Sequence, residues 1–505
     1  MTVRRPGIKV NPPVFFVSGG LLLLFLGVGV FFTDGASLFF PWILEKVSAW
    51  GGWLYVLSTA VFIGIALWLL LSRHGSTRLG PDDERPAFRT VSWFAMLFSA
   101  GMGIGMVFYG VAEPMMHYAS LPGTPPLSPQ SARQAVPVTL FHWGIHPWAT
   151  YLLVGLAIAY FSFRKGLPLA IRSCFYPLLG ERIYGLPGHL VDILAVFGTL
   201  FGLATSLGLG AMQISAGLEH VVGIPHTRST QILLIGGITL VATISLVSGV
   251  NRGIRRLSEL NLVLAAVLLL FVFIVGPTRH LLISVFLNVL GYGRELVTRT
   301  FDFGLLTGDS ADWSRSWTIF YWGWWIAWAP FVGMFVARIS RGRTIREFVL
   351  GVLLVPTAVA AVWFTVFGNT ALQIEQATGG ISMAVTQDVS TAIYVVLERL
   401  PLGIIASALA AGVVAVFFVT SSDSASFVVD MLTSGGHPNP PRWQRVFWAT
   451  TEGACAAVLL YAGGEKALQA LQAVVVSIGL PFCLVILGIG VNLVIALRQE
   501  PGPGS

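Results

Sequence analysis

WTIFYWGWWIAWAPFVGMFVARISRGR, residues 317–343, is an apolar run with five tryptophans that ends in a cluster of arginines. On a helix, the i, i+4, i+7 spacing of Tyr321, Trp325 and Trp328 places them on one face. Tryptophan often forms a belt at the membrane interface, but a belt needs only one or two near a helix end. Indole faces attract cations, and quaternary ammonium groups are common ligands of aromatic cages. The stretch therefore favours a cation-binding cage, with an interfacial belt as the alternative.

The whole chain has the composition of a membrane protein. Hydrophobic residues make up 55% of its 505 residues and charged residues 10%, whereas soluble domains are about one quarter charged. Apolar segments of about 20 residues predict membrane-spanning helices. Twelve such segments lie near 13–32, 51–72, 91–116, 137–162, 190–217, 229–250, 258–277, 314–336, 345–368, 402–424, 443–462 and 469–497. The segment 281–300 mixes Arg and Glu with Leu and Val, which predicts an amphipathic helix on the membrane surface.

Charge placement predicts the orientation. Most of the 30 lysines and arginines fall in alternate loops, and such loops are usually cytoplasmic. Both termini are therefore expected in the cytoplasm, which requires an even number of spans. The net charge of +7 is dispersed over loops, so nucleic acid is not an expected partner. Cys174, Cys455 and Cys483 lack metal-ligand spacing and are expected to be inert.

Residues 99–114, SAGMGIGMVFYGVAEP, carry alternating glycines at mid-span. Gly101 and Gly105 have the small-xxx-small spacing of close helix contacts in lipid, which is one interpretation. Three glycines in five residues, however, destabilise a helix by about 1 kcal/mol each. Secondary transporters bind substrates at such broken helices near the midplane. Glu113 follows in the same span, where a structural role and a role in transport are both open.

Residues 141–151, FHWGIHPWATY, add aromatic residues to another span. Trp148 and Tyr151 share a helix face, and a bend at Pro147 would bring Trp143 towards them. His142 and His146 have a spacing that can bind zinc. The span holds no Cys, Asp or Glu to complete a metal site, so packing or hydrogen bonding within the bundle is the favoured interpretation.

Residues 417–430, FFVTSSDSASFVVD, carry hydroxyls around Asp423. Hydroxyl oxygens suit a hard monovalent cation, although they also bond the preceding helix carbonyl. Asp423 is an ionisable residue in a membrane helix and so a functional candidate, or a solvated or capping residue near the helix end. A channel is disfavoured because no span carries a hydrophilic stripe. An enzyme is disfavoured because the sequence holds no compact catalytic constellation.

Taken together, GMGIGMVFYGVAEP, FHWGIHPWATY, YWGWWIAWAPFVGMFVARISRGRTIREF and VTSSDSASFVVDMLTSGG resemble the betaine/choline/carnitine transporter (BCCT) family over nearly the whole chain. The resemblance implies an all-α membrane protein of twelve helices, with two inverted five-helix repeats of the LeuT-like kind in spans three to twelve. It also implies a homotrimer in a bacterial inner membrane. The expected segments are a cytoplasmic tail, two peripheral helices, a first repeat, a periplasmic amphipathic helix with its loop, a second repeat and a cytoplasmic tail, at 1–12, 13–90, 91–277, 278–313, 314–497 and 498–505.

The resemblance also implies site residues. The family's aromatic box falls on Trp143, Trp148, Tyr151 and Trp325, with Trp324 and Trp328 along the pathway and Phe331 as a gate. The unwound segment facing the substrate falls on Gly101, Met102, Gly103 and Gly105. A sodium site falls on Ser99, Met102, Thr420 and Ser421, and a less secure second site on Thr199, Thr205, Ser206 and Phe331.

These positions imply sodium symport of an onium compound by alternating access, with sodium as the coupling ion and no other cofactor. Some choline carriers of the family have an acidic residue where this chain has Gly105. Its absence favours a zwitterion such as glycine betaine. A sodium-independent exchanger and a choline, carnitine or sulfonium (DMSP) carrier are the alternatives. The short terminal segments lead us to expect no osmotic sensing through the C-terminus.

Overall fold

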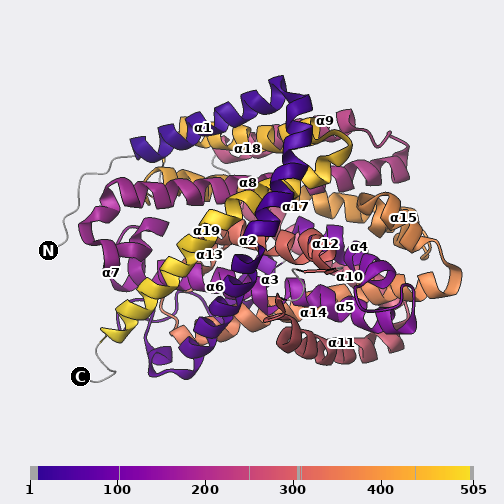
Figure 1. The fold of residues 1–505 in the computed structure, drawn as a ribbon, viewed down its shortest axis with the longest axis horizontal. Coiled ribbons are helices and arrows are strands. Elements are labelled where there is room, and N and C mark those ends of the chain that lie inside the picture. The colour runs from indigo at the N-terminus through magenta and orange to yellow at the C-terminus, as the bar shows by residue number, and fades with distance from the viewer. Residues whose placement is uncertain are drawn as a thin grey trace.

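The computed structural model describes residues 10–101, 103–248, 251–303, 307–308, 310–437 and 440–500. Over these ranges the chain is helical, and its one extended pairing is an isolated antiparallel bridge between Arg78 and Thr344. The helices cross one another in a bundle, with α1 (Pro12–Phe31) along one edge and α11 (Thr278–Arg299) along the opposite edge (Figure 1). The predicted all-α fold class is confirmed.

The other α-helices follow in chain order. They are α2 (Thr33–Leu71), α3 (Thr90–Gly101), α4 (Ile104–Ser120), α5 (Pro129–Trp143), α6 (Ile145–Ala159), α7 (Tyr176–Leu179), α8 (Leu186–Val222), α9 (Arg228–Ser248), α10 (Asn251–Val275), α12 (Ser310–Ser314), α13 (Phe320–Ile339), α14 (Ile345–Thr378), α15 (Ile381–Gln387), α16 (Ala392–Leu397), α17 (Gly403–Thr433), α18 (Arg442–Gly463) and α19 (Ala467–Arg498). One-turn π-helices at Tyr160–Arg164 and Arg315–Ile319 adjoin α6 and α13.

The helix lengths account for the predicted membrane crossings. Within the described ranges, 11 helical segments are long and apolar enough to cross a membrane, or up to 12 if α3 and α4 form one broken span. On these criteria 442–498 is one segment of 57 residues, which would extend about 85 Å against a hydrocarbon core of about 30 Å. The turn at Gly464–Lys466 divides it into α18 and α19, so it supplies two crossings. The segments that qualify also include α11. With α11 on the surface, every one of the twelve predicted crossings has a helix.

The predicted helix at 281–300 is present as α11, and its polar side faces the protein. Its buried residues are Leu281, Ser284, Asn288, Tyr292 and Glu295, which repeat every three or four positions. Asn288 Nδ2 donates to Thr365 Oγ1 at 3.0 Å and to Asn369 Oδ1 at 2.8 Å on α14. The opposite side exposes large apolar residues, including Phe286 and Leu290. The amphipathic pattern therefore serves to dock the helix on α5 and α14, while its place at the membrane surface stays a prediction.

The span with alternating glycines is broken, as predicted. The segments Thr90–Ser99 and Ile104–Ser120 are inclined by 63° to one another. Gly103 precedes α4 with an extended backbone, φ −166° and ψ 178°. The N–H groups of the first turn of α4 consequently have no partner within the helix.

The span at 137–162 is also interrupted, one turn before the position at which the bend was expected. We expected a bend at Pro147, but α5 ends at Trp143 and α6 starts at Ile145, with Gly144 between them at φ −89° and ψ −126°. Pro147 has no N–H to bond the carbonyl four residues earlier, which is that of Trp143. The proline thus interrupts the hydrogen-bond ladder one turn before its own position.

Several predicted ends were also wrong. The helix expected at 51–72 starts at Thr33, so residues 33–50 are also helical despite the charges of Asp34, Glu45 and Lys46. The expected loop at 117–136 shrinks to 121–128, because α4 and α5 extend into it. Between the crossings predicted at 345–368 and 402–424, α14 continues to Thr378, and the short helices α15 and α16 follow it.

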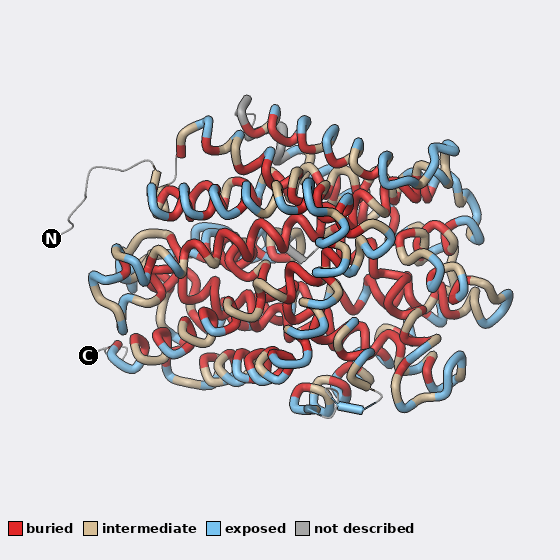
Figure 2. Tube along the Cα trace, turned by 45° about the horizontal axis from the view of Figure 1, so that its top comes forward, coloured by how far each residue is buried: buried red, intermediate tan, exposed pale blue. Residues whose placement is uncertain are grey.

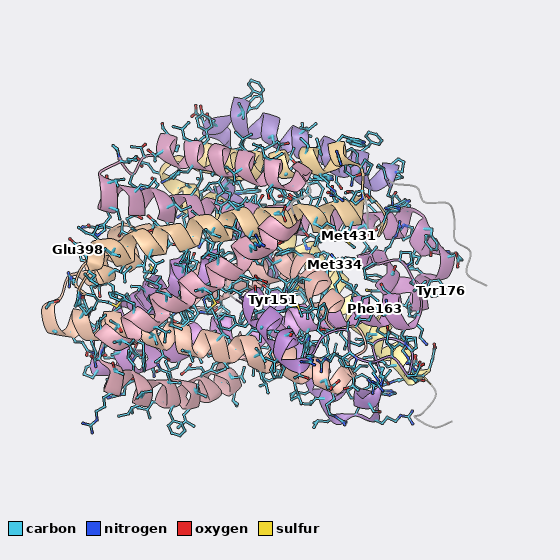
Figure 3. All side chains as sticks on the ribbon, turned by 180° about the vertical axis from the view of Figure 1, so that it is seen from behind. Tyr151, Phe163, Tyr176, Met334, Glu398 and Met431 are labelled. Atoms are coloured by element: carbon cyan, nitrogen blue, oxygen red, sulfur yellow. The ribbon has the colours of Figure 1, made fainter. Side chains whose placement is uncertain are left out.

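Helix α13, which contains the tryptophan-rich stretch, lies in the core and packs against α6, α8 and α19. Two glycines bring α6 and α13 together, since a Cβ on Gly155 would lie 2.9 Å from the carbonyl oxygen of Gly333. Buried residues line the inner helices, and exposed residues follow the outer faces (Figure 2). Tyr151 lies near the centre of the bundle, between Glu398 at one edge and Tyr176 at the other (Figure 3).

Three arginine-rich loops gather at one end of the bundle. Arg78 donates to the carbonyl of Gly342 at 3.0 Å, and Arg164 pairs with Asp82 at 2.7 Å. Glu500 joins this end through Lys165 at 2.6 Å and Arg164 at 3.2 Å. Burial alone would raise the pKa of Glu500, but hydrogen bonds from Arg164, Lys165 and Tyr160 lower it to about 2. Ion pairs and hydrogen bonds thus join loops from distant parts of the sequence at this end of the bundle.

Candidate functional site

A cavity of about 570 Å³ lies among α4, α5, α6, α8, α13 and α14. It brings together most residues of the predicted substrate site. The predicted residues in its lining are Gly103, Gly105, Trp143, Trp148, Tyr151, Trp324, Trp325 and Trp328. Gly101 ends α3, and Met102 lies outside the described residues. The lining also includes residues that were not predicted for this role, namely Ile104, Met106, Pro147, Val332, Pro356 and Ala360, and Ser206, which was assigned to another site.

The rings of this cavity form a box. Trp143 and Trp325 meet edge to face, with centroids 4.8 Å apart and planes at 69°. Trp148 and Tyr151 do the same at 5.3 Å and 81°. Tyr151 closes on Trp325 at 6.5 Å and 80°. These contacts join aromatic rings from α5, α6 and α13 around one cavity, and aromatic faces attract cations.

Hydrogen bonds hold the indoles of the box. Trp325 Nε1 donates to the carbonyl of His142 at 2.9 Å, and Trp324 Nε1 donates to the carbonyl of Gly202 at 3.2 Å. The two rings stack on each other at 4.9 Å and 12°. Since the N–H groups are bound to protein atoms, the rings have fixed orientations and need not turn when a ligand enters.

Gly105 lets the rings approach the backbone. A Cβ at this position would lie 2.8 Å from Trp143 Cη2 and 2.9 Å from Trp324 Cη2. Both distances are well inside van der Waals contact, and the atoms belong to rigid rings. At Gly103 a Cβ would meet nothing within 4 Å. The two glycines therefore differ, and only Gly105 is required by the packing of the box.

Glu113 lies directly behind the box, a place that the sequence did not reveal. Its Oε2 accepts from Trp143 Nε1 at 2.8 Å and from the Tyr321 hydroxyl at 2.5 Å. Its Oε1 accepts from His142 Nδ1 at 2.6 Å and from His117 Nε2 at 3.2 Å. Glu113 and both histidines are buried. Four polar side-chain atoms from three helices therefore surround its two oxygens.

The same residues bear on the question of a metal site. Ligand atoms of Glu113, His117 and His142 lie within 4.8 Å of one another, so the carboxylate missing from the sequence argument comes from another helix. Hydrogen bonds already occupy the acceptor positions of Glu113. His146 bonds Thr300 at 3.1 Å, away from Glu113. The histidine pair at i, i+4 is thus divided between different partners, and the cluster is organised as a hydrogen-bond network.

A second cavity of about 700 Å³ adjoins the first and shares Gly103, Trp328 and Val332 with it. Three predicted sodium ligands, Ser99, Thr420 and Ser421, line it together with the predicted gate Phe331. The ring of Phe331 meets that of Trp328 edge to face at 5.3 Å. The two rings therefore mark the boundary between the cavities.

Asn261 of α10 also lines the second cavity and was not predicted. Its side chain is buried, and neither amide atom has a hydrogen-bond partner. Buried amides of this kind are normally satisfied by water or a ligand. No signal in the sequence distinguishes Asn261 from other asparagines, because only the fold brings it to the same cavity as residues of α17.

The residues of the less secure second sodium site do not all line one of the two cavities. Ser206 lines the first cavity and donates to the carbonyl of Gly202 at 3.2 Å. Thr205 instead reaches α19, where it donates to the carbonyl of Leu471 at 3.1 Å. Thr199 donates to Ala195 at 2.9 Å within α8. Phe331 lines the other cavity. Thr199 and Ser206, seven residues apart, share one face of α8, Thr205 bonds α19 from another face, and Phe331 belongs to α13.

Comparison with known proteins agrees with this architecture. Residues 13–502 match the sequence model of the betaine/carnitine/choline family transporters. An uncharacterised transporter of Mycobacterium tuberculosis is 47% identical over 484 residues, which are 94% of this chain and 81% of the relative. Glycine betaine transporter 1 of Vibrio parahaemolyticus is 44% identical over 99% of this chain and 96% of its own. A glycine betaine/proline/choline transporter of the same organism is 41% identical, covering 98% and 91%. The chain is therefore a multi-pass membrane transporter, not an enzyme, and it belongs to the betaine/carnitine/choline transporter family.

Proposed function

We propose that this transporter imports glycine betaine together with sodium by alternating access, in the plasma membrane of a bacterium and with both termini in the cytoplasm. The observation that carries the proposal is the box of Trp143, Trp148, Tyr151 and Trp325 around the first cavity. Each cation–π contact contributes about 0.5–2 kcal/mol when desolvated, so several together bind an onium group without an acidic residue inside the cavity.

The start of α4 suits the other end of a zwitterion. Gly103, Ile104 and Gly105 line the same cavity as the aromatic box. The first N–H groups of a helix lack intrahelical partners and attract anions. A substrate with its trimethylammonium group in the box can therefore direct its carboxylate to the α4 N-terminus. This arrangement favours glycine betaine over choline, which has no carboxylate. Relatives named for glycine betaine support the same choice.

The second cavity supports coupling to sodium. Ser99, Thr420 and Ser421 bring hydroxyl oxygens from α3 and α17 to its wall. Thr420 Oγ1 donates its proton to the carbonyl of Val416 at 3.0 Å, which leaves its oxygen lone pairs available. Oxygen ligands of this kind suit a hard monovalent cation. Sodium that binds here and moves down its gradient supplies the driving force for substrate uptake. We also propose that the chain contains two inverted five-helix repeats and assembles as a homotrimer.

Uptake of labelled glycine betaine into proteoliposomes tests the proposal. Accumulation that requires an inward sodium gradient is expected. Uptake without sodium that depends on internal substrate would instead identify an exchanger. No uptake by folded protein, with uptake of choline, carnitine or a sulfonium compound in its place, would reassign the substrate.

Thr420→Val should specifically weaken sodium coupling. Valine keeps the shape of the side chain and removes one oxygen ligand, so the sodium concentration for half-maximal uptake should rise about tenfold or more, equivalent to about 1.4 kcal/mol. Ser424→Ala is the matched control, because Ser424 lines the same cavity but is absent from the proposed ligand set. The measurement is uptake rate against sodium concentration. Equal curves for Thr420→Val and wild type would remove Thr420 from the site.

Glu113→Gln should weaken substrate binding from behind the box. A carboxamide has one acceptor oxygen and adds two N–H donors, so donors that now bond Glu113 would lose their partner. An unsatisfied buried group costs about 1–3 kcal/mol, and a displaced Trp143 should lower glycine betaine affinity about tenfold. Tryptophan fluorescence titration measures this affinity. Glu398→Gln, at an exposed edge of the bundle, is expected to behave as wild type. Unchanged affinity in Glu113→Gln would mean that the network is not needed to position the box.

A further inference from the structure

Two tryptophans of the aromatic box lie on opposite sides of the break between α5 and α6. Trp143 is the last residue of α5, and Trp148 belongs to the first turn of α6. Gly144 alone joins the two helices along the chain. The geometry of the break therefore determines how the two indoles are placed relative to each other.

The start of α6 presents backbone N–H groups that need acceptors from outside the helix. The first N–H groups of any helix have no intrahelical partner, and here they belong to Ile145 and His146, because Pro147 has none. The hydroxyl oxygen of Tyr292 on α11 accepts from the Ile145 N–H at 2.7 Å. The Tyr292 side chain is buried. A helix that is distant in the sequence thus caps α6 at the break.

Two glycines allow Tyr292 to reach the break. A Cβ on Gly144 would overlap the Tyr292 hydroxyl oxygen and would lie 2.7 Å from Cζ of the same ring. A Cβ on Gly291, the residue before Tyr292, would lie 2.8 Å from Pro137 Cγ on α5. Both distances are shorter than van der Waals contact, so a side chain at either glycine would push α11 away from the break.

Thr300, which follows α11, makes a second contact with the first turn of α6. Its hydroxyl donates to the carbonyl of Leu296, so its oxygen is left to accept from His146 Nε2 at 3.1 Å. The other side of the His146 region is occupied by Trp322 of α13, which stacks on the imidazole at 4.8 Å. The end of α11 therefore holds two consecutive residues of α6, Ile145 through its backbone and His146 through its ring.

Helix α11 is itself held in place beside the cavity. It packs against α5 and α14 (Figure 1), and Asn288, one turn before Tyr292, donates to two side chains of α14. On the other side of the break, Trp143 is held by its bond to Glu113 on α4. Each side of the break thus has its own support, from α4 for Trp143 and from α11 for the helix that carries Trp148.

We propose that Tyr292 is a positioning residue for the aromatic box, because its hydroxyl fixes the break between α5 and α6 and with it the placement of Trp148 relative to Trp143. Tyr292 is not among the described residues that line the cavity. Without the hydroxyl, the Ile145 N–H must find another acceptor, and Gly144 lets the peptide turn because it has no side chain. The effect on binding rests on the proposed function, whereas the bond to Ile145 does not.

Hydrogen–deuterium exchange of the purified protein in lipid, without substrate, tests the bond at the break. Tyr292→Phe removes the hydroxyl alone, so peptides that cover 141–151 should exchange about fivefold faster than in the wild type. Tyr394→Phe is the matched control, because Tyr394 of α16 is also buried and its hydroxyl also bonds a distant backbone group, the Gln213 carbonyl, at 2.9 Å. This variant should leave exchange at 141–151 unchanged. Equal exchange in Tyr292→Phe and the wild type would overturn the proposal.

Calorimetry tests the effect on the box. Glycine betaine is compared with 3,3-dimethylbutanoate, in which carbon replaces the cationic nitrogen. A displaced indole weakens the cation–π contacts that only glycine betaine makes, so the preference for glycine betaine should fall about threefold or more in Tyr292→Phe. Tyr394→Phe should keep the preference, although each variant loses one buried hydrogen bond and some thermal stability. A preference that Tyr292→Phe retains in full would overturn the positioning role.

The two measurements separate this inference from the proposed function. A wild type that binds both ligands equally would contradict the cation-binding box, while faster exchange in Tyr292→Phe would still establish that Tyr292 holds the break. A wild type that prefers glycine betaine, together with unchanged exchange and unchanged preference in Tyr292→Phe, would leave the proposed function intact and overturn this inference.

Discussion

Trp325→Ala is expected to abolish glycine betaine uptake while the protein still inserts and folds. Trp325 lines the cavity, and its ring meets that of Trp143 edge to face at 4.8 Å and that of Tyr151 at 6.5 Å. Alanine removes that face and opens the box on one side. Loss of one or two cation–π contacts costs about 0.5–2 kcal/mol each, and the enlarged cavity lets water reach the cation. Uptake in proteoliposomes and binding by calorimetry measure the loss.

Removal of a large buried ring also costs stability, so a second tryptophan separates the two effects. Trp322 is on the same helix, is equally buried and stacks on His146 at 4.8 Å, but it is not part of the cavity lining. Trp322→Ala and Trp325→Ala should each lower the thermal midpoint, because both create cavities. Only Trp325→Ala should lose substrate affinity, and Trp325→Phe should recover part of it. Equal loss of affinity in both alanine variants would mean that packing explains the effect.

Gly105→Ala is expected to reduce affinity at least tenfold through one added methyl group. The new Cβ would lie under 3 Å from the ring tips of Trp143 and Trp324, so one or both indoles must move. Overpacking of this kind costs about 1–3 kcal/mol. The movement would narrow the cavity and disturb the bond between Trp143 and Glu113. Fluorescence titration with glycine betaine measures the loss.

Gly103→Ala is the matched test for Gly105. Its Cβ would meet nothing within 4 Å, and its extended backbone accepts any residue. Near-normal affinity is expected for this variant, even though Gly103 lines both cavities. A stronger effect at Gly103 than at Gly105 would contradict the account of the box and would favour flexibility of the α3–α4 break as the role of the glycines.

The sequence predicted the box because its residues are concentrated in two short stretches. Trp324, Trp325 and Trp328 are neighbours on one helix, and Trp148 and Tyr151 on another. The resemblance supplied their assignment to one site. The glycine break was predictable because poor helix formers cluster at 101–105. Composition alone was sufficient for the all-helical membrane class.

Other features depend on contacts between distant residues, which spacing along one helix does not reveal. Glu113 is held behind the box by hydrogen bonds with Trp143 and His142 on α5 and with Tyr321 on α13. Its own span gives no sign of these contacts, so the sequence could not distinguish it from a structural residue. The position of the break at Gly144 was missed for a local reason, since the missing N–H of Pro147 acts one turn before the proline. The early start of α2 was missed because hydropathy marks the part of a helix within lipid, whereas the helix itself continues beyond it.

The most direct test of the cation-binding box compares glycine betaine with 3,3-dimethylbutanoate by calorimetry on the purified protein. The two ligands have the same shape and the same carboxylate, but carbon replaces the cationic nitrogen. The cation–π contacts predict that the isostere binds at least tenfold more weakly. Equal affinity for the two ligands would show that the cavity recognises shape and carboxylate alone, and would contradict the central role of the aromatic faces.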